Sequence, residues 1–187
     1  HDLASWFEWA ISVTKELNFP ELEAQQRQSL GIIYDRQCRW NEAIATYETC
    51  LSIYRSLGDR DSEGYILNDL ADIYAQLGYL GKAISLYESS LSLFTELDNQ
   101  LGISQVCASL GNTYLNNGDI DMGANMIEKS FEISKELDDK EGVAHALFNL
   151  GNLYFSLKRW DDASSIYESC LEISFLTDDS RGKGYSL

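Results

Sequence analysis

The side chains that most often carry chemistry, namely cysteine, histidine and paired acids, are present but do not have catalytic or metal-binding spacing. The four cysteines are Cys38, Cys50, Cys107 and Cys170, and they include no Cys-x-x-Cys pair and no Cys/His cluster with zinc spacing. Apart from the first residue, His145 is the only histidine, so a catalytic dyad would lack its second member. Acid pairs such as Asp138-Asp139 and Asp161-Asp162 lie at expected helix starts, where capping explains them better than acid–base catalysis. We therefore expect no enzyme activity, no cofactor and no metal.

The charge of the chain limits its partners. Among 187 residues there are 30 acids and 14 bases, which gives a net charge of −16. Nucleic acids and anionic membranes are poor partners for such a chain, because both require a basic surface. A protein segment with a basic stretch is compatible. No apolar run approaches the roughly 20 residues that span a bilayer, and the cysteine pattern favours a reducing compartment, so we expect a cytoplasmic protein.

One pattern recurs four times along the chain. It is Leu-Gly-x-x-Tyr or Leu-Ala-x-x-Tyr, and successive copies start 70 − 30 = 40 residues apart, at Leu30, Leu70, Leu110 and Leu150. Other columns keep the same interval, for example Tyr47, Tyr87, Ile127 and Tyr167. A fixed interval of this length is typical of a repeat protein whose repeats stack on each other. Within each copy, apolar residues follow helical spacing, which predicts two helices per copy and an all-α fold.

The expected helices are about 3–17, 21–37, 41–57, 62–77, 80–97, 101–117, 120–137, 141–157 and 160–177, with bounds uncertain by ~2–4 residues. We expect the small residue after each leucine to let the second helix approach closely, with the tyrosine of the pattern filling the remaining gap. Gly78 and Gly118 mark turns within copies, with Cys38 and Lys158 in the same column. Between copies, Asp98-Asn99, Asp138-Asp139 and Asp178-Asp179 are expected to form turns and to cap the next helix.

The repeat register divides the chain into a second helix of a truncated repeat (1–19), four full repeats (20–59, 60–99, 100–139 and 140–179) and the start of another (180–187), all within one array. We interpret the chain as a fragment whose ends expose apolar surface. At the first end this surface would include Trp6, Phe7, Trp9 or Ile11, and at the other Tyr185 and Leu187. Such surfaces predict end-to-end self-association.

The Leu-Gly, Tyr, Ala, aromatic and small-residue columns resemble the tetratricopeptide repeat (TPR) family over nearly the whole chain. In the last copy these columns are Leu150-Gly151, Tyr154, Ala163, Tyr167 and Cys170. The 40-residue length resembles the long-helix subclass of kinesin light chains, Pins-type adaptors and bacterial TPR signalling proteins. The resemblance implies a right-handed superhelical solenoid of antiparallel helix hairpins, in which the first helix of each hairpin lines a concave groove.

The groove implied by this resemblance would bind an extended or helical segment of another protein. Its expected residues are Tyr65, Asn68, Asp72, Gln76, Gln105, Asn112, Asn116, His145, Phe148, Asn152 and Phe155. Asparagine amides would bond the ligand, and Phe148 and Phe155 would anchor its side chains. These residues could also be ordinary solvent-facing positions. The leading hypothesis is a protein-binding scaffold, and the alternative is a regulatory or sensor arm of a larger signalling enzyme.

Overall fold

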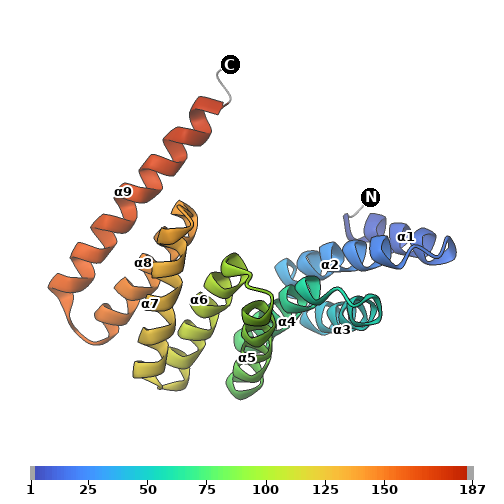
Figure 1. Ribbon diagram of the computed structural model, residues 1–187, viewed down its shortest axis with the longest axis horizontal. Coiled ribbons are helices and arrows are strands. Elements are labelled where there is room, and N and C mark those ends of the chain that lie inside the picture. Colours follow the sequence, from blue (N-terminus) through green and yellow to red (C-terminus); the bar gives the residue numbers. More distant parts are fainter. Residues whose placement is uncertain (1–2, 185–187) are drawn as a thin grey trace. The chain divides into compact units, whose positions relative to one another are not determined.

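The computed structural model describes residues 3–184, and this part of the chain consists of helices joined by short turns (Figure 1). The helices are α1 (Leu3–Glu16), α2 (Pro20–Arg36), α3 (Trp40–Leu57), α4 (Arg60–Gln76), α5 (Leu80–Glu96), α6 (Gln100–Asn117), α7 (Ile120–Glu136), α8 (Lys140–Ser156) and α9 (Trp160–Gly184). The described residues contain no strand. The predicted all-α class is therefore confirmed.

The helices belong to two compact units, of which the first ends at Leu97 and the second begins at Asp98. In the first unit α1 packs on α2, and the hairpins α2–α3 and α4–α5 pack on each other through α3 and α4. In the second unit α6–α7 and α8–α9 are hairpins, and α8 packs on both α6 and α7. The predicted antiparallel hairpins are thus present in both units. The division into four repeats with partial repeats at the ends stays a prediction.

Close approach of the two helices in a hairpin depends on the small residue after the repeat leucine. A Cβ atom added to Gly31 would lie 2.5 Å from Cε1 of Tyr47, and one added to Gly151 would lie 2.4 Å from the same atom of Tyr167. Tyr47 is buried. The ring that fills the space beside the glycine therefore comes from the second helix. The expectation that the pattern's own tyrosine fills this gap was wrong at Gly31, because Tyr34 is directed to α1, where its hydroxyl donates a hydrogen bond to Glu8.

All of the predicted turns except the last form where the sequence placed them. Within hairpins, Cys38, Gly78, Gly118 and Lys158 all have positive φ angles between 56° and 93°. Between hairpins, the left-handed residue is followed by a capping side chain. Asp59, Asn99 and Asp139 each accept a hydrogen bond from the backbone N–H three residues later. Such caps satisfy donors that the first turn of a helix leaves unpaired.

The last predicted turn is absent. The Asp178-Asp179 pair lies inside α9, which continues to Gly184 and not to about 177 as expected. After the turns that follow α3 and α7, a helix of about 17 residues packs back on the preceding helix. Among the described residues no helix follows α9 and packs back on it. Without that packing, continued helical hydrogen bonds are the more stable arrangement.

A small polar side chain on the second helix joins the two helices of most hairpins. The Cys50 thiol donates to the carbonyl oxygen of Ala24, the Ser90 hydroxyl to that of Gly64, and the Cys170 thiol to that of Ala144. Burial raises the pKa of the Cys50 thiol to about 12, so it is held as an unreactive thiol. These cysteines are packing residues, as expected from their shared column with serine. Cys107 is buried in the core, and Cys38 is exposed.

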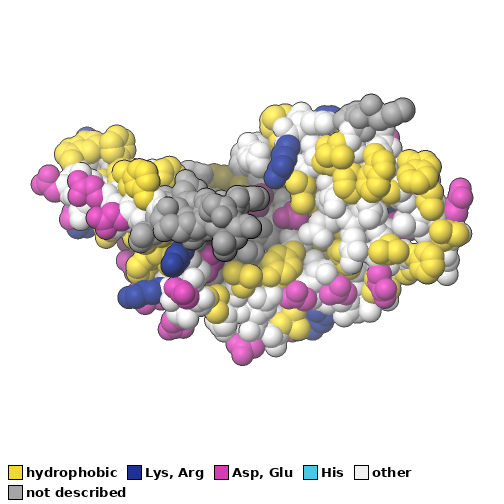
Figure 2. Space-filling model, turned by 90° about the horizontal axis from the view of Figure 1, so that it is seen from above, with side chains coloured by type: hydrophobic (Ala, Val, Ile, Leu, Met, Phe, Trp, Pro, Cys, Tyr) yellow, Lys and Arg dark blue, Asp and Glu magenta, His cyan; other side chains and the backbone are white. Residues whose placement is uncertain are grey.

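The outer face of α1 carries exposed apolar side chains. Trp6 and Trp9 are 51% and 61% exposed, and Leu3 is 60% exposed. Figure 2 shows hydrophobic side chains gathered near this end of the first unit. Ile11 is only 7% exposed and belongs to the core, so its predicted place on an open end was wrong. It belongs to the core cluster that also contains residues of α2 and α3. Tyr185 and Leu187 lie outside the described residues.

Replacing Gly31 with valine tests the close approach of α2 and α3. The added side chain would meet the buried ring of Tyr47, so we expect a loss of about 1–3 kcal/mol in the free energy of unfolding. Gly81→Ala is the matched control, because a Cβ at Gly81 meets nothing within 4 Å, and it should be neutral or stabilise by up to about 1 kcal/mol. Urea unfolding followed by circular dichroism measures both. Equal stability of Gly31→Val and the unmodified protein would contradict this account of the packing.

Candidate functional site

The second unit contains a hollow between its two first helices, α6 and α8. Its volume is about 490 Å³, which lies within the range of small ligand pockets. The side chains that line it are Asn112, Leu115, Asn116, Ile120, Phe148, Asn149, Asn152, Leu153 and Ser156. None of these residues carries a charge. The hollow therefore combines apolar walls with side-chain amides, in a chain whose net charge is −16.

Four of the predicted groove residues meet at this hollow, namely Asn112, Asn116, Phe148 and Asn152. The Tyr167 hydroxyl donates a 2.7 Å hydrogen bond to Oδ1 of Asn152. This bond orients the Asn152 amide, because its oxygen is engaged by α9 while its N–H groups remain as donors. Phe148 is 50% exposed, and its ring centroid lies 6.1 Å from that of Tyr167. Tyr167 of α9 thus contacts both Asn152 and Phe148.

Phe155 does not line this hollow. Its ring packs edge-on against Trp160 at 4.9 Å between centroids, and 56% of the residue is exposed. The two rings form an aromatic pair at the turn from α8 to α9. The structure therefore separates the two predicted anchors, and only Phe148 lies beside the asparagines.

Asn149 is a lining residue that the sequence prediction did not include. It is only 3% exposed, and its Nδ2 atom is buried with no hydrogen-bond partner among the described residues. The residues at the same position of the repeat are Ser29, Asp69 and Ser109. A polar residue directly before the core leucine of every copy was the signal that could have identified it.

Gln105 and His145 lie at a different hollow of the second unit. It has a volume of about 640 Å³ and is also lined by Leu101, Asp139, Glu141 and Gly142. It is located where α6 and α8 begin. Asp139 caps α8, so one of the Asp139 carboxylate oxygens already accepts a hydrogen bond from the Gly142 N–H. The predicted residues of this unit therefore do not form one continuous set.

In the first unit, the predicted residues of α4 are largely engaged with their neighbours. Tyr65 packs against Phe94 with ring centroids 4.7 Å apart. Asp72 accepts hydrogen bonds from Tyr87 and from Asn68. Gln76 reaches across to α2, where its Nε2 lies 3.5 Å from Oδ1 of Asp35. Unlike the hollow of the second unit, this surface contains several acids.

A further acid, Asp69, lies among them. Burial raises the pKa of the Asp69 carboxyl to about 7, and the charges of Asp72 and Asp35 act in the same direction. A hydrogen bond from the Gln28 side chain opposes this effect by favouring the carboxylate. The α2–α4 surface of the first unit thus holds three neighbouring carboxyl groups, and the Gln28 hydrogen bond offsets their repulsion only in part.

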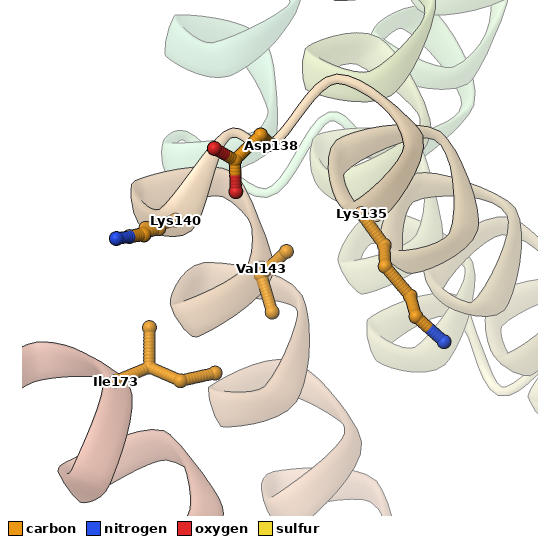
Figure 3. A pocket seen from close by; sticks show the side chains of 5 residues that line it. All are labelled: Lys135, Asp138, Lys140, Val143 and Ile173. Carbon is orange, nitrogen blue, oxygen red and sulfur yellow. The ribbon is translucent and has the colours of Figure 1, made fainter.

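A smaller hollow in the second unit contains two lysines but has no converging cationic groups. It measures about 200 Å³ and is lined by Lys135, Asp138, Lys140, Val143 and Ile173. Figure 3 shows that the ammonium groups of Lys135 and Lys140 point away from each other, with Val143 and Ile173 between the helices. This arrangement does not form a site in which two cations hold one anion. Across the described residues, no three His, Cys, Asp or Glu side chains are grouped so as to hold a metal ion.

Comparison with known families decides which fold family is present. The family model described as Tetratricopeptide repeat matches residues 24–96 and 104–174, which is more than half of the 187 residues. The chain belongs to the tetratricopeptide repeat family. The close-packed glycine or alanine column and the left-handed turns described above are the physical features by which this TPR sequence forms its hairpins.

Solved structures with the same fold support the TPR assignment. BtubC (BKLC) from P. vanneervenii is 26% identical, with a TM-score of 0.79 over 93% of this chain and 72% of that one. A putative kinesin light chain from Podosopora anserina, with nearly identical TPR-like repeats, is 15% identical with a TM-score of 0.67. That match covers 93% of this chain and 86% of the other. MamA is 18% identical, with a TM-score of 0.64 over 96% and 98% of the two chains.

Among curated proteins no match was found. Within the part of the TPR chain that the structure describes, no helix has the length and apolar character needed to cross a membrane.

Replacing Asp69 with asparagine tests whether the raised pKa of this carboxyl makes the stability of the TPR array depend on pH. The folded state holds the Asp69 proton up to about pH 7, whereas the unfolded chain releases it near pH 4. The folded protein is therefore destabilised as pH rises from about 4 to 7, and the effect is constant above that range. Asp69→Asn should stabilise by roughly 1–3 kcal/mol at pH 8 and have little effect near pH 4. Asparagine fits this position, since Asn149 occupies it in another copy.

Urea unfolding at several pH values measures the difference between the Asp69→Asn variant and the unmodified protein. Glu48→Gln is the control, because Glu48 is an exposed acid on α3 and its replacement removes the same charge from the protein surface. If the difference in free energy of unfolding between Asp69→Asn and the unmodified protein is the same at pH 4 and pH 8, then the pKa of Asp69 is not raised in the folded state.

Proposed function

We propose that this TPR protein is a protein–protein interaction scaffold that binds a peptide or protein segment on its first helices. The hollow between α6 and α8 carries the proposal. Its apolar walls can receive side chains, and its amides can bond a peptide backbone. The proposal assigns no catalytic role, and it places the protein in the cytoplasm because all four cysteines are free thiols.

Charge supports a ligand with a basic stretch outside this hollow. Asp35, Asp69 and Asp72 lie close together on the α2–α4 surface of the first unit, and the whole chain has a net charge of −16. A negative field speeds the encounter with a cationic ligand and weakens as salt screens it over roughly 8 Å at physiological ionic strength. The ligand that we propose therefore carries basic residues as well as apolar ones.

The alternative role, a sensor arm of a larger signalling enzyme, uses the same binding surface. The two roles differ in what is joined to the array. An adjoining ATPase or protease domain in the full-length gene would favour the sensor arm, and its absence would favour an independent adaptor.

Selection from a library of random peptides tests binding directly. We expect selected peptides to combine basic with apolar residues, to bind the isolated protein, and to associate more slowly as salt concentration rises. Peptides whose binding changes the amide signals of α6 and α8 in NMR spectra would support the surface proposed. Failure to select any specific peptide, or selection only of peptides that contact the second helices, would overturn the proposal.

Substitution of two asparagines provides the quantitative prediction. Asn112→Ala with Asn152→Ala should weaken binding of a selected peptide by about 1 kcal/mol or more, because two amide contacts are lost. The pair should remain folded, since both residues lie at the hollow. Asn125→Ala is the matched control, because Asn125 is an exposed asparagine of the same unit on the second helix α7. Isothermal titration calorimetry measures the affinities, and unchanged affinity of the double variant would show that the ligand uses another face.

We also propose end-to-end self-association of this chain through α1. Trp6 and Trp9 are more than half exposed, and aromatic surface of this kind favours contact with a second molecule. Trp9→Glu should weaken the association in sedimentation equilibrium at least several-fold while the protein stays folded. The residues at its repeat position are the polar Thr49, Ser89, Lys129 and Ser169, all exposed. Met122→Ser, an exposed apolar residue on α7, is the control. A monomer at millimolar concentration would refute this proposal.

A further inference from the structure

The turn between α6 and α7 contains the only Asn-Gly pair of the sequence, Asn117-Gly118. Both residues are exposed, and a Cβ atom added to Gly118 would meet no described atom within 4 Å. Every other asparagine is followed by a residue with a side chain. A glycine leaves its own backbone nitrogen unshielded, because no side chain stands beside it. This nitrogen can therefore approach the side-chain carbonyl carbon of Asn117 if the turn opens.

In the closed turn, hydrogen bonds occupy the backbone that would have to react. The Gly118 N–H donates to the carbonyl oxygen of Leu115 at 3.1 Å, and the Asp119 N–H donates to that of Tyr114 at 2.9 Å. Gly118 has a φ of 93°, so these two bonds belong to a left-handed cap at the end of α6. A nitrogen held in this way cannot attack its neighbour. The reaction therefore requires the last turn of α6 to open.

The hairpins α2–α3, α4–α5 and α8–α9 have a restraint across this turn. In each of them a cation at the start of the second helix lies over a tyrosine ring of the first helix. The distances to the ring centroid are 4.3 Å for Arg39, 3.8 Å for Lys82 and 4.6 Å for Arg159. Such contacts hold the two sides of a turn together. The equivalent positions of the α6–α7 hairpin hold Asp119 and Met122, so we expect this turn to open more easily.

We propose that Asn117 is a spontaneous modification site, at which the side-chain amide is lost as ammonia when the last turn of α6 opens. The Gly118 backbone nitrogen gives up its proton and attacks Cγ of Asn117. A carbon–nitrogen bond forms, the bond from Cγ to Nδ2 breaks, and ammonia leaves with the proton, which yields a succinimide ring. Water then adds to one of the two ring carbonyls and opens the ring to aspartate or isoaspartate. Water is the only co-reactant, and no group is oxidised or reduced.

The products destabilise the turn in which they form. In the unmodified protein, Nδ2 of Asn117 donates a 2.7 Å hydrogen bond to the Asp119 carboxylate. An aspartate at this position replaces that bond by repulsion between two carboxylates, and it puts negative charge at the C-terminal end of α6, where the helix dipole disfavours it. Isoaspartate adds one carbon to the main chain, so the cap hydrogen bonds of Gly118 and Asp119 cannot keep their geometry. These effects require no ligand, so the proposal is independent of the binding function.

Incubation of the full chain at mildly alkaline pH, both folded and in guanidinium chloride, tests the site. Peptide mapping by mass spectrometry follows the exchange of NH2 for OH at each asparagine. We expect Asn117 to react before every other asparagine, and at least five-fold more slowly in the folded chain than in the denatured one. The proposal is overturned if another asparagine reacts first in the folded chain, if the two rates are equal, or if folded Asn117 is intact after ten half-lives of the denatured chain.

Gly118→Lys tests the chemistry of the attack. The new side chain stands beside the attacking nitrogen, so the loss of ammonia should slow at least ten-fold in both the folded and the denatured chain. Lys158 occupies the same repeat position with a φ of 59°, so the turn accepts lysine, and circular dichroism checks the fold. An unchanged rate in the denatured chain would show that ammonia is not lost by attack of the Gly118 nitrogen.

Asp119→Arg combined with Met122→Glu tests the opening of the turn. The double variant introduces into α7 the ion pair that Arg39 and Glu42 form at 3.0 Å in α3. The ratio of the folded to the denatured rate should fall at least two-fold, because an arginine at position 119 can then lie over the ring of Tyr114. An unchanged ratio would overturn the dependence of the reaction on turn opening.

The aged protein itself gives an additional readout. Modified chains, separated from unmodified ones by ion exchange, should unfold at a lower guanidinium concentration than the fresh protein. Equal midpoints of the two would contradict the destabilising effect of the products.

Discussion

The contact between a glycine or alanine on the first helix and a large side chain on the second determines the geometry of each hairpin. At Gly31 and Gly151 the tyrosine ring of the partner helix occupies the place where a Cβ would be. At Gly111 the partner is Ile127, which is fully buried. Glycine inside a helix costs roughly 1 kcal/mol relative to alanine, and this cost is offset by the dispersion contacts and apolar burial that the short distance allows.

Polar groups then fix the register of the helices that this contact brings together. The thiol or hydroxyl of Cys50, Ser90 and Cys170 donates to a carbonyl of the first helix, which is possible only when the helices lie close. Capping by Asp59, Asn99 and Asp139 sets where each following first helix begins. Because caps and cross-helix bonds recur at the same repeat position, each hairpin has nearly the same geometry, and the remaining sides of the first helices are free to vary.

The variable sides of the first helices carry different residues in the two units. On α4 of the first unit the variable positions hold Asp69 and Asp72, and the pKa of Asp69 is raised by burial and, to a smaller extent, by the charge of Asp72. Between α6 and α8 of the second unit they hold asparagines and apolar residues without charge. Asp69 and Asn149 occupy the same repeat position. At this repeat position α4 therefore carries a carboxyl group and α8 an amide.

The sequence alone determined the helices, the hairpins, the small-residue contact and most turns, because these depend on short-range patterns that recur every 70 − 30 = 40 residues. The family resemblance implied a groove that includes Asn112, Asn116, Phe148 and Asn152, and these four residues line one hollow. Only the tertiary structure showed that Phe155 packs on Trp160, that Gln105 and His145 lie at another hollow, and that Asn149 has a buried amide without a partner among the described residues. The structure also showed that α9 continues past Asp178 to Gly184. Repeat periodicity predicts which positions are equivalent, but burial and hydrogen bonding at one position depend on the side chains of neighbouring helices, which the periodicity does not specify.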